Sequence, residues 1–292
     1  MKCRLFLSMA VLMWVTVFDG AFCAGFPEVL AEFENGSIDW SSGVVEASGV
    51  GGPCKRLPDG SRQEEEAMAE ACAAARKNLL QIVERIRIDS HKTVGDLLER
   101  DPEARKRLLT LIDSIQPLMT PGIRSDDFAE VRLSMSIHGS FSQIVLPSEI
   151  KQIDPIRAVS PMKPPPAFPG SEPPSGKSPV HSGMIVDAKG LVEVKPAMVP
   201  RIVDEAGNQI YGPAFVSREY AVESGMSVYM QEIQLAKTSS RVEPNPLIVK
   251  GLKTKNDGRS IIVVSNADAS KLRHASEHFS FLKQCRVIIV VD

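Results

Sequence analysis

The clearest pattern in the first half of the chain is a helical stripe of apolar residues. Between residues 67 and 86 apolar side chains recur at every third or fourth position, which predicts an amphipathic helix of about 25 residues. Ser61 suits the cap of this helix, and Glu64, Glu65 and Glu66 suit its first turn. The stripe consists of Met68, Ala71, Cys72, Ala75, Leu79, Ile82, Val83 and Ile86.

From residue 130 the apolar period changes from three or four to two. Polar residues there alternate with Val131, Leu133, Met135 and Ile137. Such alternation predicts a strand in a sheet with one covered face, and the long helix is the expected cover.

Weaker signals complete a first domain, expected over residues 26–149. Apolar residues from Ile38 and Trp40 to Val45 and Ala47 predict one early strand, with Gly43 as a bulge or bend. The residues expected to end that strand are Gly49, Gly51, Gly52 and Pro53. Asp101-Pro102 predicts the cap and first position of a further helix. Its expected buried face holds Leu108, Leu109, Ile112 and Ile115.

A second domain is expected over residues 181–292. Short strands are predicted at 184–186 and 247–249, and a hairpin at 201–203 and 209–211 around the turn 205–208. The end of the chain reads as strand, helix and strand at 261–264, about 268–278 and 287–291. Continuous apolar runs at both ends suit central strands joined by a crossover helix.

Proline separates these two regions. Ten of the 21 prolines fall between Pro147 and Pro179, with no sustained apolar period. Because proline fixes φ and removes a donor, residues 150–180 are expected to form an extended, semi-rigid linker. A proline-recognition ligand at Pro164-Pro165-Pro166 is the functional alternative. The predicted fold class is therefore α+β: two small domains, the first a sheet covered by a long helix, the second a mixed sheet ending in a strand-helix-strand unit.

The first 24 residues have the parts of a secretory signal peptide. Lys2 and Arg4 precede an apolar run of about 14 residues, too short to cross a bilayer as a helix, and small residues follow it. Cys23 could instead carry a lipid, although Phe22 stands where a lipobox has a small residue. No later segment is apolar enough to span a membrane.

Charge and aromatic content narrow the function classes. The formal net charge is −2 and aromatic residues make up 5% of the chain. A slightly acidic protein with few stacking side chains does not suit general nucleic-acid binding.

Of the five cysteines, Cys3 and Cys23 belong to the leader. The three that remain cannot all pair internally, and no metal-binding thiolate cluster is predicted. A bridge between Cys54 and Cys72 is one reading after export, and a buried thiol at Cys72 is the other. No cofactor is expected.

One motif carries metal chemistry. His274, Glu277 and His278 fit the H-x-x-E-H pattern of inverted zinc proteases, in which two imidazoles four positions apart share a helix face. The expected core face of that helix, with Leu272, Ala275 and Phe279, turns both imidazoles outward, and only 14 residues follow for a further ligand. A solvated histidine pair is the favoured interpretation, so no metal ligand is assigned.

Three other candidates have structural explanations. Gly49-Val-Gly51-Gly52 lacks the third glycine of a nucleotide loop, which would stand at Cys54, so a turn is expected. Asp187 and Asp204 could act as acid and base, but each ends a strand before a turn. The run 64–66 complements a helix N-terminus better than it supplies calcium ligands. No catalytic residue is assigned.

The first domain resembles a known bacterial family. The residues that carry the resemblance are the leader, the segment Trp40-Ser-Ser-Gly-Val-Val-Glu-Ala-Ser-Gly49, the helix from Ala67 with its Ala-Arg-Lys-Asn-Leu-Leu80 ending, and the strand 131–137. Over about 120 residues they are similar to the Lpp-type surface lipoproteins and the N-terminal domain of the flagellar assembly protein FlgT. The resemblance implies a non-enzymatic envelope protein, with some relatives at the outer membrane or the base of the flagellum.

The expected function is a binding or assembly module, exported to the periplasm or the periphery of the outer membrane. Its expected partners are envelope proteins, and the linker would let the domains reach separate partners. The alternatives are a small-ligand or lipid-binding module in the C-terminal domain and a zinc hydrolase that uses His274, Glu277 and His278.

Overall fold

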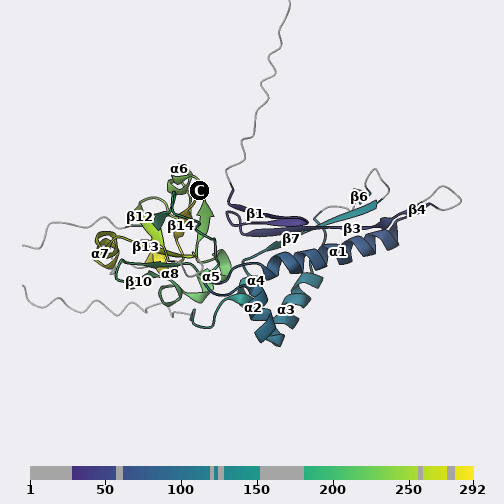
Figure 1. The fold of residues 1–292 in the computed structure, drawn as a ribbon, viewed down its shortest axis with the longest axis horizontal. Coiled ribbons are helices and arrows are strands. Elements are labelled where there is room, and N and C mark those ends of the chain that lie inside the picture. The colour runs from purple at the N-terminus through teal and green to yellow at the C-terminus, as the bar shows by residue number, and fades with distance from the viewer. Residues whose placement is uncertain are drawn as a thin grey trace, which may run out of the picture.

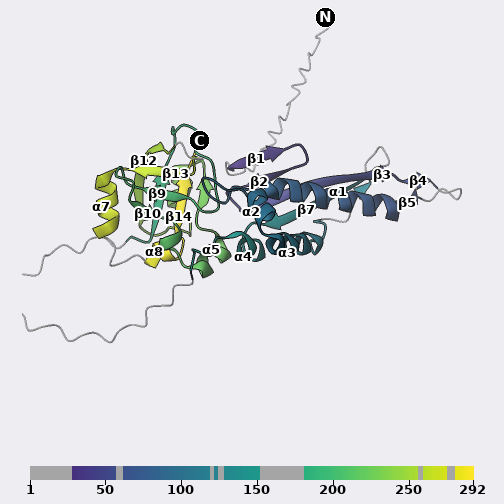
Figure 2. The same ribbon diagram turned by 60° about the horizontal axis from the view of Figure 1, so that its bottom comes forward.

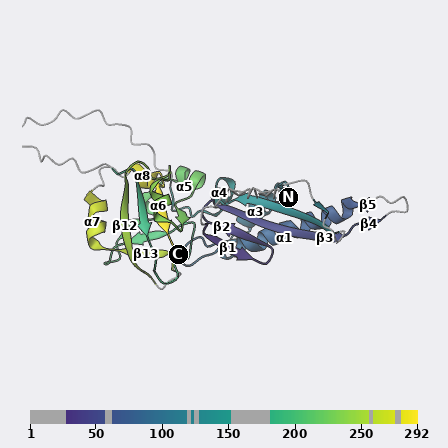
Figure 3. The same cartoon turned by 90° about the horizontal axis from the view of Figure 1, so that it is seen from above.

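The computed structural model describes residues 28–56, 62–118, 122–123, 128–151, 181–255, 259–274 and 280–292. The predicted leader, the Ser61 cap and nearly all of the predicted linker lie outside these residues. The fold is α+β, and its two domains lie end to end along the long axis (Figure 1; Figure 3).

An antiparallel five-stranded sheet forms the first domain, in the order β1-β2-β3-β7-β6. Its strands are β1 (Leu30–Phe33), β2 (Gly36–Asp39), β3 (Val44–Pro53), β6 (Gly122–Ile123) and β7 (Phe128–Ser136). The pair β4 (Lys55–Arg56) and β5 (Arg62–Gln63) extends beyond it. The alternation predicted at 131–137 is confirmed, because the four apolar residues are buried.

The early strand differs from its prediction in two ways. It is a hairpin of β2 and β3 instead of one strand, because Gly43 has φ +71 and lies in the turn between them, not in a bulge. The glycines at 49, 51 and 52 do not end β3, which continues to Pro53.

The long helix α1 (Glu64–Glu84) covers one face of this sheet (Figure 2). The predicted acidic first turn is present, but the helix has 21 residues, and Ile86 is buried just beyond its end. A Cβ at Gly49 would lie 2.1 Å from the Ala75 nitrogen, and one at Gly51 would lie 1.8 Å from the Ala67 oxygen. The glycines therefore let strand and helix approach at backbone distance, which leaves no phosphate-binding loop at this position.

Two further helices pack beside α1. Thr93 caps α2 (Val94–Arg100), an element without a clear sequence signal, through a reciprocal capping box with Asp96. Asp101 caps α3 (Pro102–Asp113) as predicted. Its Oδ1 accepts from the Glu103 amide at 3.0 Å and from the Ala104 amide at 2.9 Å. Leu108 and Ile112 of α3 are buried, whereas Leu109 is exposed. The short helix α4 (Ser140–Val145) then faces the second domain (Figure 1).

The second domain is a mixed seven-stranded sheet in the order β10-β9-β13-β12-β8-β14-β11. The predicted hairpin and short strands are all present. The strands are β8 (Gly183–Asp187), β9 (Arg201–Val203), β10 (Gln209–Tyr211), β11 (Val228–Met230), β12 (Pro246–Thr254), β13 (Ile261–Val264) and β14 (Val287–Val290).

The crossover expected at the end of the chain is wrong. β13 is antiparallel to β12, whereas β12, β8 and β14 are mutually parallel, so β13 and β14 run in opposite directions with two strands between them. β12 joins the two halves of the sheet and has a register irregularity between Gly251 and Lys253. β13 and β14, the last two strands of the chain, lie inside the sheet and are largely buried, as their apolar runs indicated.

Short helices cover the second sheet. They are η1 (Pro213–Phe215), α5 (Arg218–Ser224), α6 (Ile233–Lys237), α7 (Asn266–His274) and α8 (Ser280–Lys283). Ala236 of α6 packs with Ile185 and Ile288 in a small cluster. The opposite face, with Met184 and Ile289, belongs to a larger core that continues into the first domain. The two domains therefore share one hydrophobic core.

Candidate functional site

The junction of the two domains holds the most unusual chemistry among the described residues. Main-chain hydrogen bonds cross it at several places, so the domains are fixed by backbone as well as by side chains. The donors and acceptors are Met198 N to Arg87 O (3.0 Å), Val199 N to Ile88 O (2.8 Å), Gly139 N to Val222 O (2.7 Å), Arg218 N to Lys151 O (3.1 Å) and Tyr229 N to Trp40 O (3.4 Å).

The Arg218 guanidinium adds a further connection between the domains. It donates from Nη1 to the Pro147 carbonyl at 2.9 Å and from Nη2 to the Gln143 carbonyl at 3.2 Å. These carbonyls lie at and beyond the C-terminal half of α4, where a cation is favoured by the helix dipole. Arg218 of α5 thus completes the end of a helix in the other domain.

An aromatic pair lies at the centre of the junction. The rings of Trp40 and Tyr229 meet edge to face, with centroids 5.8 Å apart and an interplanar angle of 77°. The Tyr229 hydroxyl donates to the Ala197 carbonyl and accepts from the Ala197 amide, both at 3.0 Å. Burial raises the pKa of Tyr229 to about 12, so the phenol stays protonated at neutral pH.

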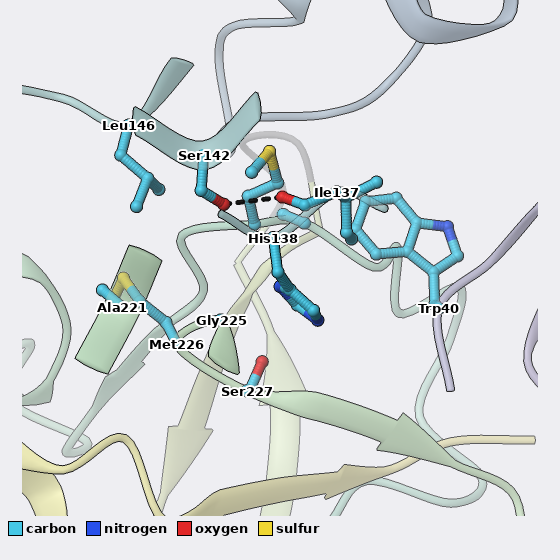
Figure 4. Close-up of a pocket in the computed structure, with 11 residues that line it drawn as sticks. Trp40, Ile137, His138, Ser142, Leu146, Ala221, Gly225, Met226 and Ser227 are labelled. Carbon is cyan, nitrogen blue, oxygen red and sulfur yellow. Dashed lines mark hydrogen bonds between the residues drawn. The ribbon is translucent and has the colours of Figure 1, made fainter. Parts of the chain in front are cut away.

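His138 lies beside Trp40 of this pair and lines the same cavity (Figure 4). A Cβ at Gly43 would lie 2.4 Å from its Nε2, and a Cβ at Gly225 would lie 2.7 Å from its Cε1. Both glycines have positive φ, +71 and +72 respectively, and they belong to different domains. The imidazole therefore lies between two backbone turns that only glycine suits.

A small cavity of about 20 Å³ adjoins this imidazole. Its walls include Trp40, Ile137, His138, Ser142, Met226 and Ser227 (Figure 4). His138 Nδ1 and Ser227 Oγ are buried there without a hydrogen-bond partner among the described residues, whereas Ser142 Oγ donates to the Ile137 carbonyl at 2.6 Å. The volume suits a single water molecule and is far too small for an organic substrate.

The electrostatics of the junction keep the imidazole neutral. Burial lowers the pKa of His138, and the positive charge of Arg241 lowers it further. In the described part of the chain, Arg241 is held by carbonyls: Nε donates to Val287 O at 3.0 Å, Nη1 to Ser224 O at 2.8 Å and Nη2 to Gly225 O at 2.7 Å. Gly225 thus contacts His138 on one side and Arg241 on the other.

This arrangement does not resemble a nucleophile with its base. No carboxylate lines the cavity to orient the imidazole, and neither serine hydroxyl is hydrogen-bonded to it in the part of the chain that is described. Burial raises the pKa of the nearby Cys285 thiol to about 11, which leaves little thiolate at neutral pH. The hydrogen bonds of Ser142 and of Arg241 each stay within one domain, so the domains are joined by the main-chain bonds and by Arg218.

A second hollow at the junction is open to solvent and much larger. This cleft has a volume of about 450 Å³. The first domain contributes Glu28, Asp39, Ser41 and Ser42, and the second contributes Met230, Glu232, Leu235, Thr238, Ser239 and Ser240. Its size is that of a small-ligand or peptide site.

The structure does not test the zinc alternative at His274, Glu277 and His278. Glu277 and His278 lie outside the described residues, and His274 is the last residue of α7. The predicted core residue Leu272 is buried, whereas Ala275 and Phe279 are not described. Among the residues that are described, no three His, Cys, Asp or Glu side chains lie close enough together to hold a metal ion.

The remaining candidates have structural partners. Asp204 accepts from the Asn208 amide at 2.8 Å in the β9–β10 turn and pairs with Arg273 at 2.5 Å. The hydrogen bonds from Arg273 and then from Asn208 hold the pKa of Asp204 well below its usual range. Asp187 pairs with Lys250 at 2.9 Å, and its other oxygen accepts from the Lys189 amide at 3.2 Å. Each aspartate accepts a bond from a main-chain amide of the turn after its strand, as expected, and each also pairs with a basic residue from another element.

The described cysteines Cys54, Cys72 and Cys285 are free thiols, so Cys54 and Cys72 do not form a bridge in this structure. Within the residues that the structure covers, no helix is both long and apolar enough to cross a bilayer.

Sequence reasoning did not find the junction. His138 follows the alternating strand, and Trp40 was assigned to a strand instead of a turn. The sequence feature that could have indicated the junction is the glycine at each of its turns, at positions 43, 139 and 225. Contacts between segments 67 to 189 residues apart, such as Arg218 with Lys151 and Tyr229 with Trp40, leave no periodic pattern.

Comparison with known proteins bears on the second domain. Residues 183–292 match a family described as Treponema pallidum Tp0624, second domain. The match begins at the first residue of β8, which agrees with the domain seen here. No curated protein matches the chain.

Proposed function

We propose that this protein is a non-enzymatic, exported envelope protein that acts as a binding or assembly module in the periplasm or at the outer membrane. Export rests on the signal-like first 24 residues, and a link to the flagellum rests on the resemblance of the first domain to the Lpp-type and FlgT group. Its partners are other envelope proteins.

The observation that carries the proposal is the way in which the two domains are joined. Among the described residues, five main-chain hydrogen bonds and the carbonyl contacts of Arg218 cross the junction. The imidazole and the aromatic pair of the junction are used in this contact. A body held in this way presents an outer surface of fixed shape, which lowers the entropy cost of binding a partner.

The proposed mode of action differs from the expected one. A linker between independent domains suits two separate partners, but the domains here share a core. We therefore expect one composite surface that spans both domains, including the open cleft between them.

Crosslinking in the producing cell tests this proposal. A photoreactive residue at Ser42, beside the cleft, should capture envelope proteins, whereas one at Glu99 on the exposed side of α2 should capture them much less. Both variants report on the same folded protein, so a difference between them locates the binding surface. Absence of envelope proteins from the captured set at both positions contradicts the proposal.

A small-ligand module is the second candidate, and the cleft volume of about 450 Å³ favours it. Native mass spectrometry of protein purified from the producing cell distinguishes the two. A retained small molecule, together with no captured protein, supports the ligand-binding alternative.

A further inference from the structure

The open cleft has an acidic lining. Glu28, Asp39 and Glu232 contribute carboxylates, and no Lys, Arg or His is among the described residues that line it. Lys189 pairs with Glu232 at 3.5 Å, but both side chains are exposed, at 38% and 51%. Exposed pairs of this kind contribute little and exchange readily, so Glu232 remains available to a ligand.

The same cleft also offers apolar and hydroxyl groups. Met230 and Leu235 are half-buried in its wall, and five hydroxyl side chains belong to the same lining. The hydroxyl groups are those of Ser41, Ser42, Thr238, Ser239 and Ser240. Ser41 Oγ accepts from the Val29 amide at 2.8 Å, and Thr238 Oγ1 donates to the Leu235 carbonyl at 3.2 Å. Because a hydroxyl both donates and accepts, each of these keeps one capacity for the amides or carbonyls of an extended peptide.

A bare metal ion does not suit this lining. No metal-binding group of three acidic, His or Cys residues exists in the described chain, which includes all three carboxylates of the cleft. Separated carboxylates beside apolar side chains instead match a Lys or Arg side chain, whose charged end follows a long apolar stem.

We propose that the cleft binds a basic segment of a partner protein, with Lys or Arg side chains against Glu28, Asp39 and Glu232 and an apolar side chain against Met230 and Leu235. Charge complementarity supports this occupant. The inference rests on the proposed function, because it names the kind of partner that the module binds. Both domains supply carboxylates, so the docked arrangement builds the site.

Fluorescence anisotropy with the full-length protein tests the inference. The probe is the labelled peptide Gly-Lys-Leu-Lys-Leu-Gly, compared with Gly-Glu-Leu-Glu-Leu-Gly and with Gly-Lys-Ser-Lys-Ser-Gly. We expect measurable binding of the first peptide, weaker binding of the serine peptide and none of the acidic peptide. Raising the salt concentration should weaken binding of the first peptide.

Paired variants locate the interaction. Glu28→Gln with Glu232→Gln should lower the affinity roughly 2- to 30-fold, as the loss of two partly exposed charge contacts implies. Glu99→Gln with Glu103→Gln is the matched control, because it removes the same charge from exposed positions on α2 and α3. Leu235→Ala should weaken binding of the leucine peptide and leave that of the serine peptide unchanged.

Three outcomes overturn the inference. They are equal weakening by the two double variants, equal affinity for the basic and acidic peptides, and binding of spermidine as tight as that of the peptide, which would assign the cleft to a free polyamine. Circular dichroism confirms that each variant folds. If crosslinking at Ser42 still captures envelope proteins while the peptide outcomes fail, the proposed function stands and only the cleft assignment is lost.

Discussion

His138 couples the protonation state of one side chain to the contact between two domains. The imidazole is held between Gly43 and Gly225, and burial together with Arg241 lowers its pKa below the usual 6.5. Trp40 and Ser227 also line its cavity, and Arg241 is the charged group that acts on it. Protonation therefore opposes docking.

The sign of the pH effect follows from this shift. Between the lowered pKa and 6.5, the unfolded chain binds a proton at this position and the folded protein does not. The free energy of unfolding should therefore decrease as pH falls through that window. Above pH 6.5, titration of His138 adds nothing to the pH dependence of this free energy. Thermal unfolding measured from about pH 8 to about pH 5 checks this for the wild type.

A pair of histidine variants isolates the effect. His138→Asn should remove part of the loss of stability at acidic pH, while His91→Asn, at an exposed position, should leave the profile unchanged. An identical pH dependence in the wild type and in His138→Asn would contradict the assignment.

Gly225 permits a second test at the level of one residue. Gly225→Ala places a Cβ at φ +72 and 2.7 Å from His138, so we expect destabilisation of about 1–3 kcal/mol. Gly190→Ala is the matched control, since φ there is +76 but no atom lies within 4 Å of the new Cβ. Chemical denaturation should show the larger loss at Gly225, and equal losses would mean that contact with the imidazole adds nothing.

At the scale of elements, the contact between α1 and β3 depends on small residues. Gly49→Ala would place a Cβ 2.1 Å from the Ala75 nitrogen, which is backbone and cannot move aside. We expect a loss of more than about 3 kcal/mol or failure to fold. Gly52→Ala meets only the Glu70 carboxylate, at 2.8 Å, and should be tolerated. Denaturant midpoints of the two variants, compared with the wild type, decide the point.

Periodic elements were predictable from the sequence, and irregular ones were not. The stripe of α1, the alternation of β7, the Asp101 cap and the β9–β10 hairpin each have a local signal, and each is present. The expectation that glycines end the strand gave the wrong end for β3. Tertiary packing of β3 against the alanines of α1 overrode the local tendency of glycine to interrupt a strand. The order of β13 and β14 depends on pairing with β12 and β8, which no local pattern encodes.

At the scale of the whole molecule, two domains were expected and two are present. The contact between them was not predicted, because the residues that make it come from separate short segments: 40–43, 87–88, 138–151, 197–199 and 218–229. The open cleft was missed for the same reason. Its walls come from two domains, and no local sequence pattern predicts how these domains are placed relative to each other.

The shared core has a consequence for chain continuity. If the junction is held by its own hydrogen bonds and apolar contacts, the covalent connection between residues 151 and 181 is not needed to bring or keep the two domains together. Fragments 25–151 and 181–292, co-expressed as separate polypeptides, should reconstitute a 1:1 heterodimer that survives gel filtration at concentrations on the order of 1 µM. Arg218→Ala should loosen that heterodimer and Arg107→Ala, on the exposed side of α3, should not. A protease that nicks the proline-rich segment would then leave one particle of unchanged hydrodynamic size.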